Sequence, residues 1–454
     1  MLEITGIFSP KRVQLITMGC SKNRVDSEKL LHKLSGGGLE IIPEEQPYEV
    51  SRPDVVIINT CGFIGDAKKE SIDEILSAAQ AKKAGHVGKI VVCGCLSERY
   101  LKDLEESVPE VDAFFGAFQW KKVVEWMGLE SGKLSSAPHS WTGRFLTTPS
   151  HYAYLKIADG CNRKCSYCAI PLIKGRFRSV PMATLEREAK ELASKGVREL
   201  ILIAQDTTFY GMDLYGKKML APLIERLSRT EGIEWIRIHY SYPAGFPRDV
   251  LRVMAQNPKV CKYLDIPLQH SSSKILKMMR RGVDRQKTQK LIDDLRTMVP
   301  GVALRTTMIV GHPGETEEEF CDLLDFVRHN RFEMLGAFTY SEEEGTYDAR
   351  NFADDVPSAV KKRRYGRLMR LQSKISLENN LRRIGGVEKV IIDDVRDGYL
   401  ICRSQKESPE VDGTIVVRLP EGCTPDIARE QFIGKFAAVR ITGAGEYDLE
   451  GELA

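Results

Sequence analysis

Three cysteines in one short stretch are the strongest candidates for chemistry in this sequence. Cys161, Cys165 and Cys168 follow a glycine and are separated by three and then two residues, so their thiols can turn toward one centre. Soft thiolates select iron–sulfur clusters, zinc or copper(I). A closed zinc site or an electron-transfer cluster usually takes four ligands, and the next cysteine is Cys261. The pattern favours a four-iron cluster with one open iron over a zinc site completed by a distant histidine such as His151.

The residues around this motif resemble those of a known family. The spacing Cys-x3-Cys-x2-Cys resembles the signature of the radical S-adenosylmethionine enzymes. The stretches 159–171 and 174–179 look like the methylthiotransferase branch, and within it the type that modifies a ribosomal protein. The resemblance implies that Cys161, Cys165 and Cys168 are catalytic: they hold a cluster that reduces S-adenosylmethionine and releases a 5′-deoxyadenosyl radical. Such a radical can break an unactivated carbon–hydrogen bond, which no side-chain acid or base can do at neutral pH.

A second set of three cysteines, Cys20, Cys61 and Cys95, lies near the N-terminus. They come directly after three β-branched runs, at 13–18, 54–59 and 89–93. In an open parallel sheet the C-terminal strand ends line one edge, so these thiols are expected to meet there, although free cysteines are often only small buried apolar residues. The resemblance implies an auxiliary cluster on these cysteines, hence two [4Fe-4S] clusters in all, and a second S-adenosylmethionine spent as methyl donor to the transferred sulfur.

Cys93 is the ambiguous cysteine of this region. It ends the third expected strand only two residues before Cys95, and by strand alternation the two side chains could point the same way. The family pattern uses the second of the pair, so we leave Cys93 outside the site as a spare thiol near the cluster. The four remaining cysteines stand alone and are expected to be structural: Cys261, Cys321, Cys402 and Cys423.

Two further strand ends are expected to bind S-adenosylmethionine. The stretch 308–315 contains Gly311 and Glu315, has glycines where backbone must approach a ligand, and resembles the adenine-contacting strand of the family. Gln205 occupies the loop that holds the methionine part in the family, and we expect it to meet the ammonium group. The neighbouring Asp206 could instead be an ordinary cap of the next helix.

Length and composition describe an ordinary globular protein. The 454 residues are too many for one core and indicate two to four domains, and the hydrophobic content of 42% and charged content of 28% are typical. No apolar run approaches the length of a membrane span, and the N-terminus lacks a signal pattern. We therefore expect a cytoplasmic monomer without membrane contact, in which the eleven cysteines bind metal rather than form disulfides.

The order of expected elements predicts an α/β protein of three domains. Residues 11–127 alternate strands and helices, which predicts an open parallel sheet, and residues 128–148 lose periodicity like a linker. Residues 149–384 contain six βα units, which predict a partial (β/α)6 barrel with functional residues at the C-terminal strand ends. Residues 385–452 contain short strands, the last at 444–449, which predict a small antiparallel barrel. This barrel resembles the TRAM module, which commonly binds RNA.

Charge is unevenly distributed toward the C-terminus. Residues 357–383 form an expected long helix with a basic face, most simply a solvated one. From residue 386 to the end there are 8 Lys and Arg against 14 Asp and Glu, a balance of −6 within a chain of net charge +3. An acidic barrel repels phosphate and attracts a basic protein, so we expect Asp393, Asp394 and Asp397 to face a basic partner.

Three functions from different classes are weighed. The resemblance implies methylthio transfer to the β-carbon of an aspartate in protein twelve of the small ribosomal subunit, either free or assembled, and residues 204–211 and 238–243 look like this protein-modifying branch. The alternative is the relative that modifies a tRNA adenosine. The third is a non-catalytic iron- or zinc-binding module that uses the small barrel to hold a partner. Either enzyme needs an electron donor such as a flavodoxin or ferredoxin.

Overall fold

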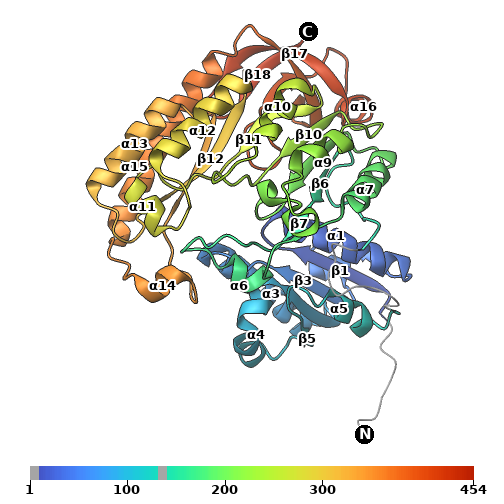
Figure 1. Ribbon diagram of the computed structural model, residues 1–454. Coiled ribbons are helices and arrows are strands. Elements are labelled where there is room, and N and C mark those ends of the chain that lie inside the picture. The colour runs from blue at the N-terminus through green and yellow to red at the C-terminus, as the bar shows by residue number, and fades with distance from the viewer. Residues whose placement is uncertain (1–9, 131–140) are drawn as a thin grey trace.

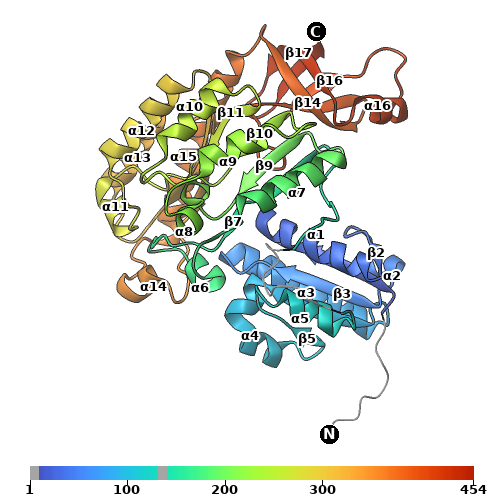
Figure 2. The same ribbon diagram turned by 45° about the vertical axis from the view of Figure 1, so that its right-hand side comes forward.

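The computed structural model describes residues 10–130 and 141–454 in three successive parts (Figure 1). Residues 131–140, within the expected linker 128–148, lie outside the described residues. The N-terminal sheet, in blue, and the C-terminal barrel, in red, lie on opposite sides of the central sheet in both views (Figures 1 and 2).

The first part is a parallel sheet covered by helices on both faces, as predicted. Its strand order is β2-β1-β3-β4-β5. The strands are β1 (Arg12–Thr17), β2 (Glu40–Ile42), β3 (Val55–Thr60), β4 (Lys89–Gly94) and β5 (Ala113–Phe114). The helices are α1 (Ser21–Gly36), α2 (Tyr48–Ser51), α3 (Gly65–Lys83), α4 (Cys95–Ser107) and α5 (Trp120–Trp126). Alternate residues of β4 enter two different apolar cores, which is why its sequence is a continuous apolar run.

The second part is a six-stranded, all-parallel sheet, which confirms the partial barrel. Its order is β13-β12-β11-β10-β9-β6, with β6 and β13 as unpaired edges of this sheet. The strands are β6 (Tyr152–Lys156), β9 (Glu199–Ile203), β10 (Trp235–Ile238), β11 (Val260–Asp265), β12 (Ala303–Val310) and β13 (Met334–Thr339), and the short strands β7 (Ala158–Asp159) and β8 (Arg178–Ser179) pair beside them. The large helices on its outer face are α7 (Met182–Ser194), α9 (Leu220–Leu227), α10 (Arg248–Gln256), α12 (Arg285–Met298), α13 (Glu317–Asn330) and α15 (Ser358–Leu381). The shorter elements are α6 (Ile170–Lys174), the 3-10 helix η2 (Thr207–Phe209), α8 (Met212–Tyr215), α11 (Ser273–Met278) and α14 (Tyr347–Asn351).

Helix α15 corrects the expectation of a purely solvated basic face. Lys361 and Arg364 are buried. The Lys361 ammonium donates to the Tyr340 carbonyl at 3.2 Å, and Arg364 pairs with Glu315 at 2.9 Å. Part of the basic run therefore anchors α15 to the sheet, because buried charges are retained only with partners.

The third part is a closed five-stranded barrel, formed by β14 (Val387–Arg396), β15 (Tyr399–Ser404), β16 (Ile415–Arg418), β17 (Phe436–Ala444) and β18 (Leu449–Leu453), with α16 (Pro425–Phe432) between β16 and β17. One pairing differs from the antiparallel expectation, because β16 and β18 are parallel. An odd number of strands cannot alternate direction all the way around a closed barrel. The last expected strand, 444–449, instead contains the end of β17, a turn at residues 445–448 and the first residue of β18.

The loop between β15 and β16, residues 405–414, docks the barrel against the inner face of the central sheet. Its contacts with that sheet are Ser408 Oγ with His239 Nε2, Tyr154 Oη to Glu410 and Tyr263 Oη to Asp412, each at 2.8 Å. Asp412 also pairs with Arg305 at 3.2 Å. The third part is thus built into the central domain rather than tethered to it.

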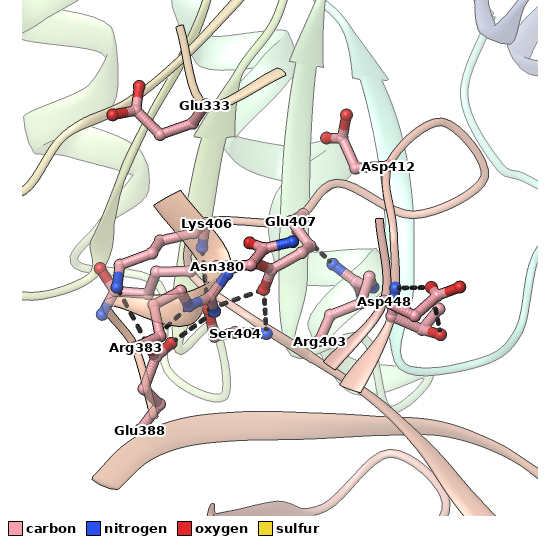
Figure 3. Close-up of polar contacts among 12 residues, drawn as sticks. Glu333, Asn380, Arg383, Glu388, Arg403, Ser404, Lys406, Glu407, Asp412 and Asp448 are labelled. Atoms are coloured by element: carbon pink, nitrogen blue, oxygen red, sulfur yellow. Dashed lines mark hydrogen bonds and ion pairs between the residues drawn. The ribbon is translucent and has the colours of Figure 1, made fainter. Parts of the chain in front are cut away.

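Several acidic residues of the third part lie in ion pairs within the protein, which corrects the expectation for Asp393. Asp393 accepts from Arg403 and lies 2.8 Å from His151, and Arg403 also pairs with Glu199 at 2.8 Å. In the neighbouring network, Arg383 contacts Glu388 and Glu407 (Figure 3). Asp394 pairs with Arg396 at 2.5 Å, and Asp397 is exposed. Asp393 is therefore not free to face a basic partner.

A buried ion cluster joins the first two parts of the chain. Arg144 pairs with Glu28 of α1 and, at 2.9 Å, with Glu188 of α7, which also accepts from Lys29 at 3.0 Å. Lys29 and Arg144 hold the pKa of Glu188 below its usual value despite its burial.

Replacing Arg144 by Met should destabilise the protein by about 3–5 kcal/mol, because it leaves two carboxylates buried without their shared guanidinium. The measurement is the urea midpoint of unfolding. The matched control is Arg198→Met, since Arg198 is exposed and should change the midpoint little. Equal midpoints for the two variants would contradict a role for the cluster in joining the domains.

Candidate functional site

The loop with Cys161, Cys165 and Cys168 begins at the C-terminal end of the first barrel strand, as the barrel fold predicts. Gly160 precedes it with φ +78°, and a side chain there would collide with the Arg176 carbonyl. Only glycine fits this position without strain. The loop closes on itself because the Cys161 amide donates to the Gly175 carbonyl at 3.1 Å.

The three thiols of this loop are half-buried and share polar contacts. Arg281 Nη1 donates to Cys165 Sγ and the Arg163 amide to Cys161 Sγ, each at 3.4 Å. Burial raises the pKa of Cys161 to about 11 and raises that of Cys168, to which the neighbouring Cys165 adds. Both shifts favour the protonated thiols of Cys161 and Cys168 in the metal-free protein, so metal binding must release these protons.

The spacing of side chains suits a cluster better than a single ion. Within residues 10–130 and 141–454, no three His, Cys, Asp or Glu side chains converge closely enough to hold one metal ion. A four-iron cluster binds each thiolate at a different iron, so its ligands need not converge on a point. The donor set of three soft thiolates on one loop fits such a cluster.

Polar atoms without protein partners lie beside this loop. Gln205 Nε2 donates to Asp159 at 3.0 Å, and its Oε1 is buried without a partner among the described residues. Arg163 is held by Asp206 at 2.7 Å and over the Tyr242 ring at 4.0 Å, and its Nη2 likewise has no described partner. A free amide oxygen and a free guanidinium nitrogen match the ammonium and carboxylate of an amino acid, so these residues fit the methionine part of S-adenosylmethionine.

Asp206 is the N-cap of η2, which confirms the capping interpretation, and it makes a second contact. Its Oδ1 accepts from the Thr208 amide at 3.0 Å, at the start of η2, while Oδ2 accepts from Arg163. The sequence analysis overlooked Arg163 and Tyr242. Arg163 lies between two of the expected ligand cysteines, and Tyr242 lies in the loop after β10. Neither position in the sequence indicates by itself that the residue contacts a ligand.

Gly311 and Glu315 lie together at the end of β12. The Gly311 amide donates to Glu315 Oε2 at 2.8 Å. Glu315 also pairs with Arg364 at 2.9 Å and lies 3.4 Å from His270 Nε2. Its carboxylate thus has protein partners that shape the strand end, and contact of either residue with adenine stays a prediction.

Cys20, Cys61 and Cys95 meet at one edge of the N-terminal sheet. A side chain at Gly19, whose φ is +84°, would lie 2.7 Å from Cys61 Sγ, so glycine lets Cys61 pack beside Cys20. Asn23 donates to carbonyls of the β1–α1 loop and of β3, and its carbonyl accepts from the Cys95 thiol at 3.8 Å. Burial raises the pKa of Cys61 to about 12 and that of Cys95 to about 11, and Cys20 adds to both shifts.

Cys93 lies in a different environment from Cys95. It is 1% exposed and packs with Val91 and Trp120 in the apolar core of the N-terminal sheet. Cys95 is the first residue of α4 and contacts other residues. The chain leaves the strand between them, so strand alternation does not relate the two side chains, and this supports leaving Cys93 out of the site.

The N-terminal thiols face the cysteine loop of the central domain. Cys95 packs against Ala169, which directly follows Cys168, and against Ile173 of α6. Lys174, at the end of α6, is buried and lies 3.7 Å from Asp26 of α1. Electrostatic interaction with Cys95 and Asp159 raises the pKa of this lysine even though burial opposes the shift. The two thiol sets thus lie next to the same contact between the first and second parts of the chain.

The sequence matches three family models. Residues 12–116 match an uncharacterized protein family, UPF0004, residues 155–327 the radical SAM superfamily, and residues 384–454 the TRAM domain. None of the helices in the described parts of the chain is long and apolar enough to cross a membrane.

Full-length relatives share about half of their residues with this chain. The ribosomal protein uS12 methylthiotransferase RimO of Porphyromonas gingivalis is 49% identical over 438 residues, which cover 96% of this chain and 98% of that protein. The same enzyme of Cytophaga hutchinsonii is 49% identical over 445 residues, covering 97% and 98%.

A solved structure shares the fold. The radical S-adenosylmethionine methyltransferase TsrM of Kitasatospora setae, with cobalamin and a [4Fe-4S] cluster bound, has a TM-score of 0.54 over 92% of this chain and 84% of its own. At 14% identity this likeness shows the fold alone.

Proposed function

The chain belongs to the RimO family of ribosomal protein uS12 methylthiotransferases, and we propose that it adds a methylthio group to the β-carbon of an aspartate in protein uS12 of the small ribosomal subunit. The observation that carries this proposal is identity of 49% over nearly the whole length of such enzymes. The substrate class follows because the similarity covers all three parts of the chain, including the C-terminal barrel.

Membership in this family implies a [4Fe-4S] cluster and S-adenosylmethionine, which together supply the radical chemistry that breaks an unactivated carbon–hydrogen bond. In our proposal Cys161, Cys165 and Cys168 hold that cluster, Gln205 and Arg163 bind the methionine part of S-adenosylmethionine, and Gly311 and Glu315 border its adenine.

The proposed second cluster belongs to the N-terminal thiols. Cys20, Cys61 and Cys95 hold it and present the sulfur, and a second S-adenosylmethionine is the methyl donor. The packing of Cys95 against Ala169 supports this proposal, because it brings the source of sulfur close to the site of hydrogen removal.

The remaining partners are also proposals. The electron donor is a small redox protein such as a flavodoxin or ferredoxin, since the reducing cluster needs one electron at a time. The enzyme works as a cytoplasmic monomer on uS12, free or within the assembled subunit, because ribosomal proteins are made and used in that compartment.

Mass spectrometry of ribosomal proteins and of digested tRNA tests the function. We expect cells lacking this gene to lose the methylthio group of uS12 and to regain it when the gene is restored, with tRNA nucleosides unchanged. Loss of a tRNA adenosine modification with intact uS12 would identify the alternative enzyme.

The exposed acids of the β17–β18 hairpin test where the basic substrate docks. Reversing Glu446, Glu450 and Glu452 to Lys should weaken uS12 binding by about 1–2 kcal/mol in total, because each exposed charge contributes only a few tenths to one. Binding measured at rising salt should converge for variant and wild type. The matched control reverses three exposed acids of α4, Asp103, Glu105 and Glu106. Equal losses in both variants would contradict docking at the barrel.

A further inference from the structure

Lys22 is a buried cation without a carboxylate partner. Five lysines of the described chain are buried: Lys22, Lys29, Lys156, Lys174 and Lys361. Four of them lie within ion-pair distance of an aspartate or glutamate, namely Lys29, Lys156, Lys174 and Lys361. Among the described residues Lys22, at 8% exposure, has no such pair. A buried ammonium without a carboxylate partner is costly, so other groups around Lys22 must compensate its charge.

The position of Lys22 joins the two halves of the site. It stands two residues after Cys20 in the first turn of α1. Its ammonium lies 3.1 Å from the centre of the Tyr240 ring, and Tyr240 comes two residues after the C-terminal end of β10. Lys22 therefore lies between the N-terminal thiols and the mouth of the partial barrel, where the substrate of a barrel enzyme binds.

The aromatic platform under Lys22 is held in an uncommon backbone conformation. Tyr240 has φ +55°, which is rare for a residue with a side chain, and its amide donates to Asp265 Oδ2 at 3.0 Å. Such outliers collect at functional sites. The ring offers the ammonium a cation–π contact, which offsets part of the desolvation but leaves the N–H donors of Lys22 available.

The nearest acidic group is already engaged. Tyr240, Cys20 and Asp265 interact electrostatically with Lys22, Tyr240 also hydrogen-bonds to it, and together they raise the pKa of this lysine although burial opposes the shift. The Asp265 carboxylate, however, accepts from the Tyr240 amide and pairs with Arg305 at 3.3 Å. Asp265 thus orients the platform, and Lys22 keeps N–H donors beside Cys20 that an anion from outside the chain can accept from.

We propose that Lys22 binds the carboxylate of the substrate aspartate and thereby sets the preference for that side chain. The inference rests on the proposed function and goes beyond it by naming the residue that recognises the substrate. The carboxylate is bonded directly to the β-carbon that reacts, so a cation beside Cys20 holds that carbon near the sulfur-presenting thiols. The adenine of the alternative substrate carries no negative charge for Lys22 to bind.

The test compares wild type with Lys22→Met, which keeps the length of the side chain and removes its charge. Two peptides copy the modified segment of uS12, one with the aspartate and one with asparagine in its place. We expect Lys22→Met to reduce the affinity for the aspartate peptide by about 10- to 100-fold, which is the range for a hydrogen bond to a charged group. The affinity for the asparagine peptide should fall by less than about threefold. Affinity for S-adenosylmethionine and iron content should not change.

Controls separate recognition from structure. Lys22→Arg should keep the preference, because the charge remains. Lys29→Met removes a buried lysine that has a partner, Glu188, so it should lower the unfolding midpoint without changing the aspartate-to-asparagine ratio. Lys22→Met strands no carboxylate and should keep the wild-type midpoint. Affinities are also measured on cluster-free proteins, so that a variant with a weakened N-terminal cluster still reports on the peptide.

The outcomes distinguish the two proposals. A wild-type ratio of affinities in Lys22→Met, or a loss of affinity for S-adenosylmethionine instead of the peptide, overturns the role of Lys22. If the wild type modifies neither the peptide nor intact uS12, the proposed function itself is overturned. Modification of tRNA in place of uS12 would overturn it as well.

Discussion

Replacing Cys161, Cys165 and Cys168 together by alanine abolishes the reductive cleavage of S-adenosylmethionine and removes about half of the bound iron. The physical reason is that the three thiols share one loop and have partners from the same domain, such as Arg281 on Cys165. The N-terminal thiols are held by a separate set of contacts, centred on Asn23. The cluster proposed there should therefore survive.

Iron and sulfide analysis after anaerobic reconstitution, together with an assay for 5′-deoxyadenosine, checks this result. A double variant of Cys321 and Cys423, which are the exposed and half-buried solitary cysteines, is the matched control and should keep full iron and full cleavage. Unchanged iron in the triple variant, or surviving cleavage, would falsify the assignment of this loop.

Replacing Cys20, Cys61 and Cys95 by alanine should separate two abilities of the enzyme. We expect 5′-deoxyadenosine to form at a rate within about threefold of wild type, because the residues that bind S-adenosylmethionine belong to the central domain. The methylthio product should disappear completely, because the source of sulfur is lost. The measurement pairs the cleavage assay with mass spectrometry of uS12.

Cys93 provides the control for that variant. Cys93→Ala changes one buried apolar residue of the N-terminal core, so it should cost some stability and keep both the iron content and the product. Product from the triple variant would move the sulfur site elsewhere, and a loss of iron in Cys93→Ala would make this residue a ligand.

Periodicity and strand-end cysteines were sufficient to predict the main architecture. The apolar runs of β1, β3 and β4 predict buried parallel strands, and each is followed by one cysteine of the N-terminal set. The parallel pairing of β16 with β18 could not be predicted from local pattern, because it follows from closure of an odd-numbered barrel. Arg364 looked like part of a solvated basic face because its partner Glu315 is 49 residues away.

The site was predictable only where one segment carries its own signature. Gln205 and the cysteines stand at strand ends, whereas Lys22 and Lys174 acquire meaning from contacts between domains that no sequence spacing encodes. Tyr240 supports Lys22 from more than 200 residues away. The net charge of the barrel was a weak guide to its binding surface for the same reason, because Asp393 and Asp412 form ion pairs within the protein.

Strand β15 and the loop that follows it also influence the order of folding during synthesis. Glu199, on the inner face of the central sheet, pairs with Arg237 of the same sheet at 2.7 Å and takes its second partner from Arg403 of β15, which is 204 residues later in the chain. At a synthesis rate of 5–20 residues per second, Arg403 is made about 10 to 40 s after Glu199. A nascent chain that has completed β13 therefore still exposes an inner face whose tyrosine hydroxyls, on Tyr154 and Tyr263, lack their partners Glu410 and Asp412. A chain truncated before β15 lacks Arg403 and the loop 405–414, so its central domain should be less stable than in the full chain.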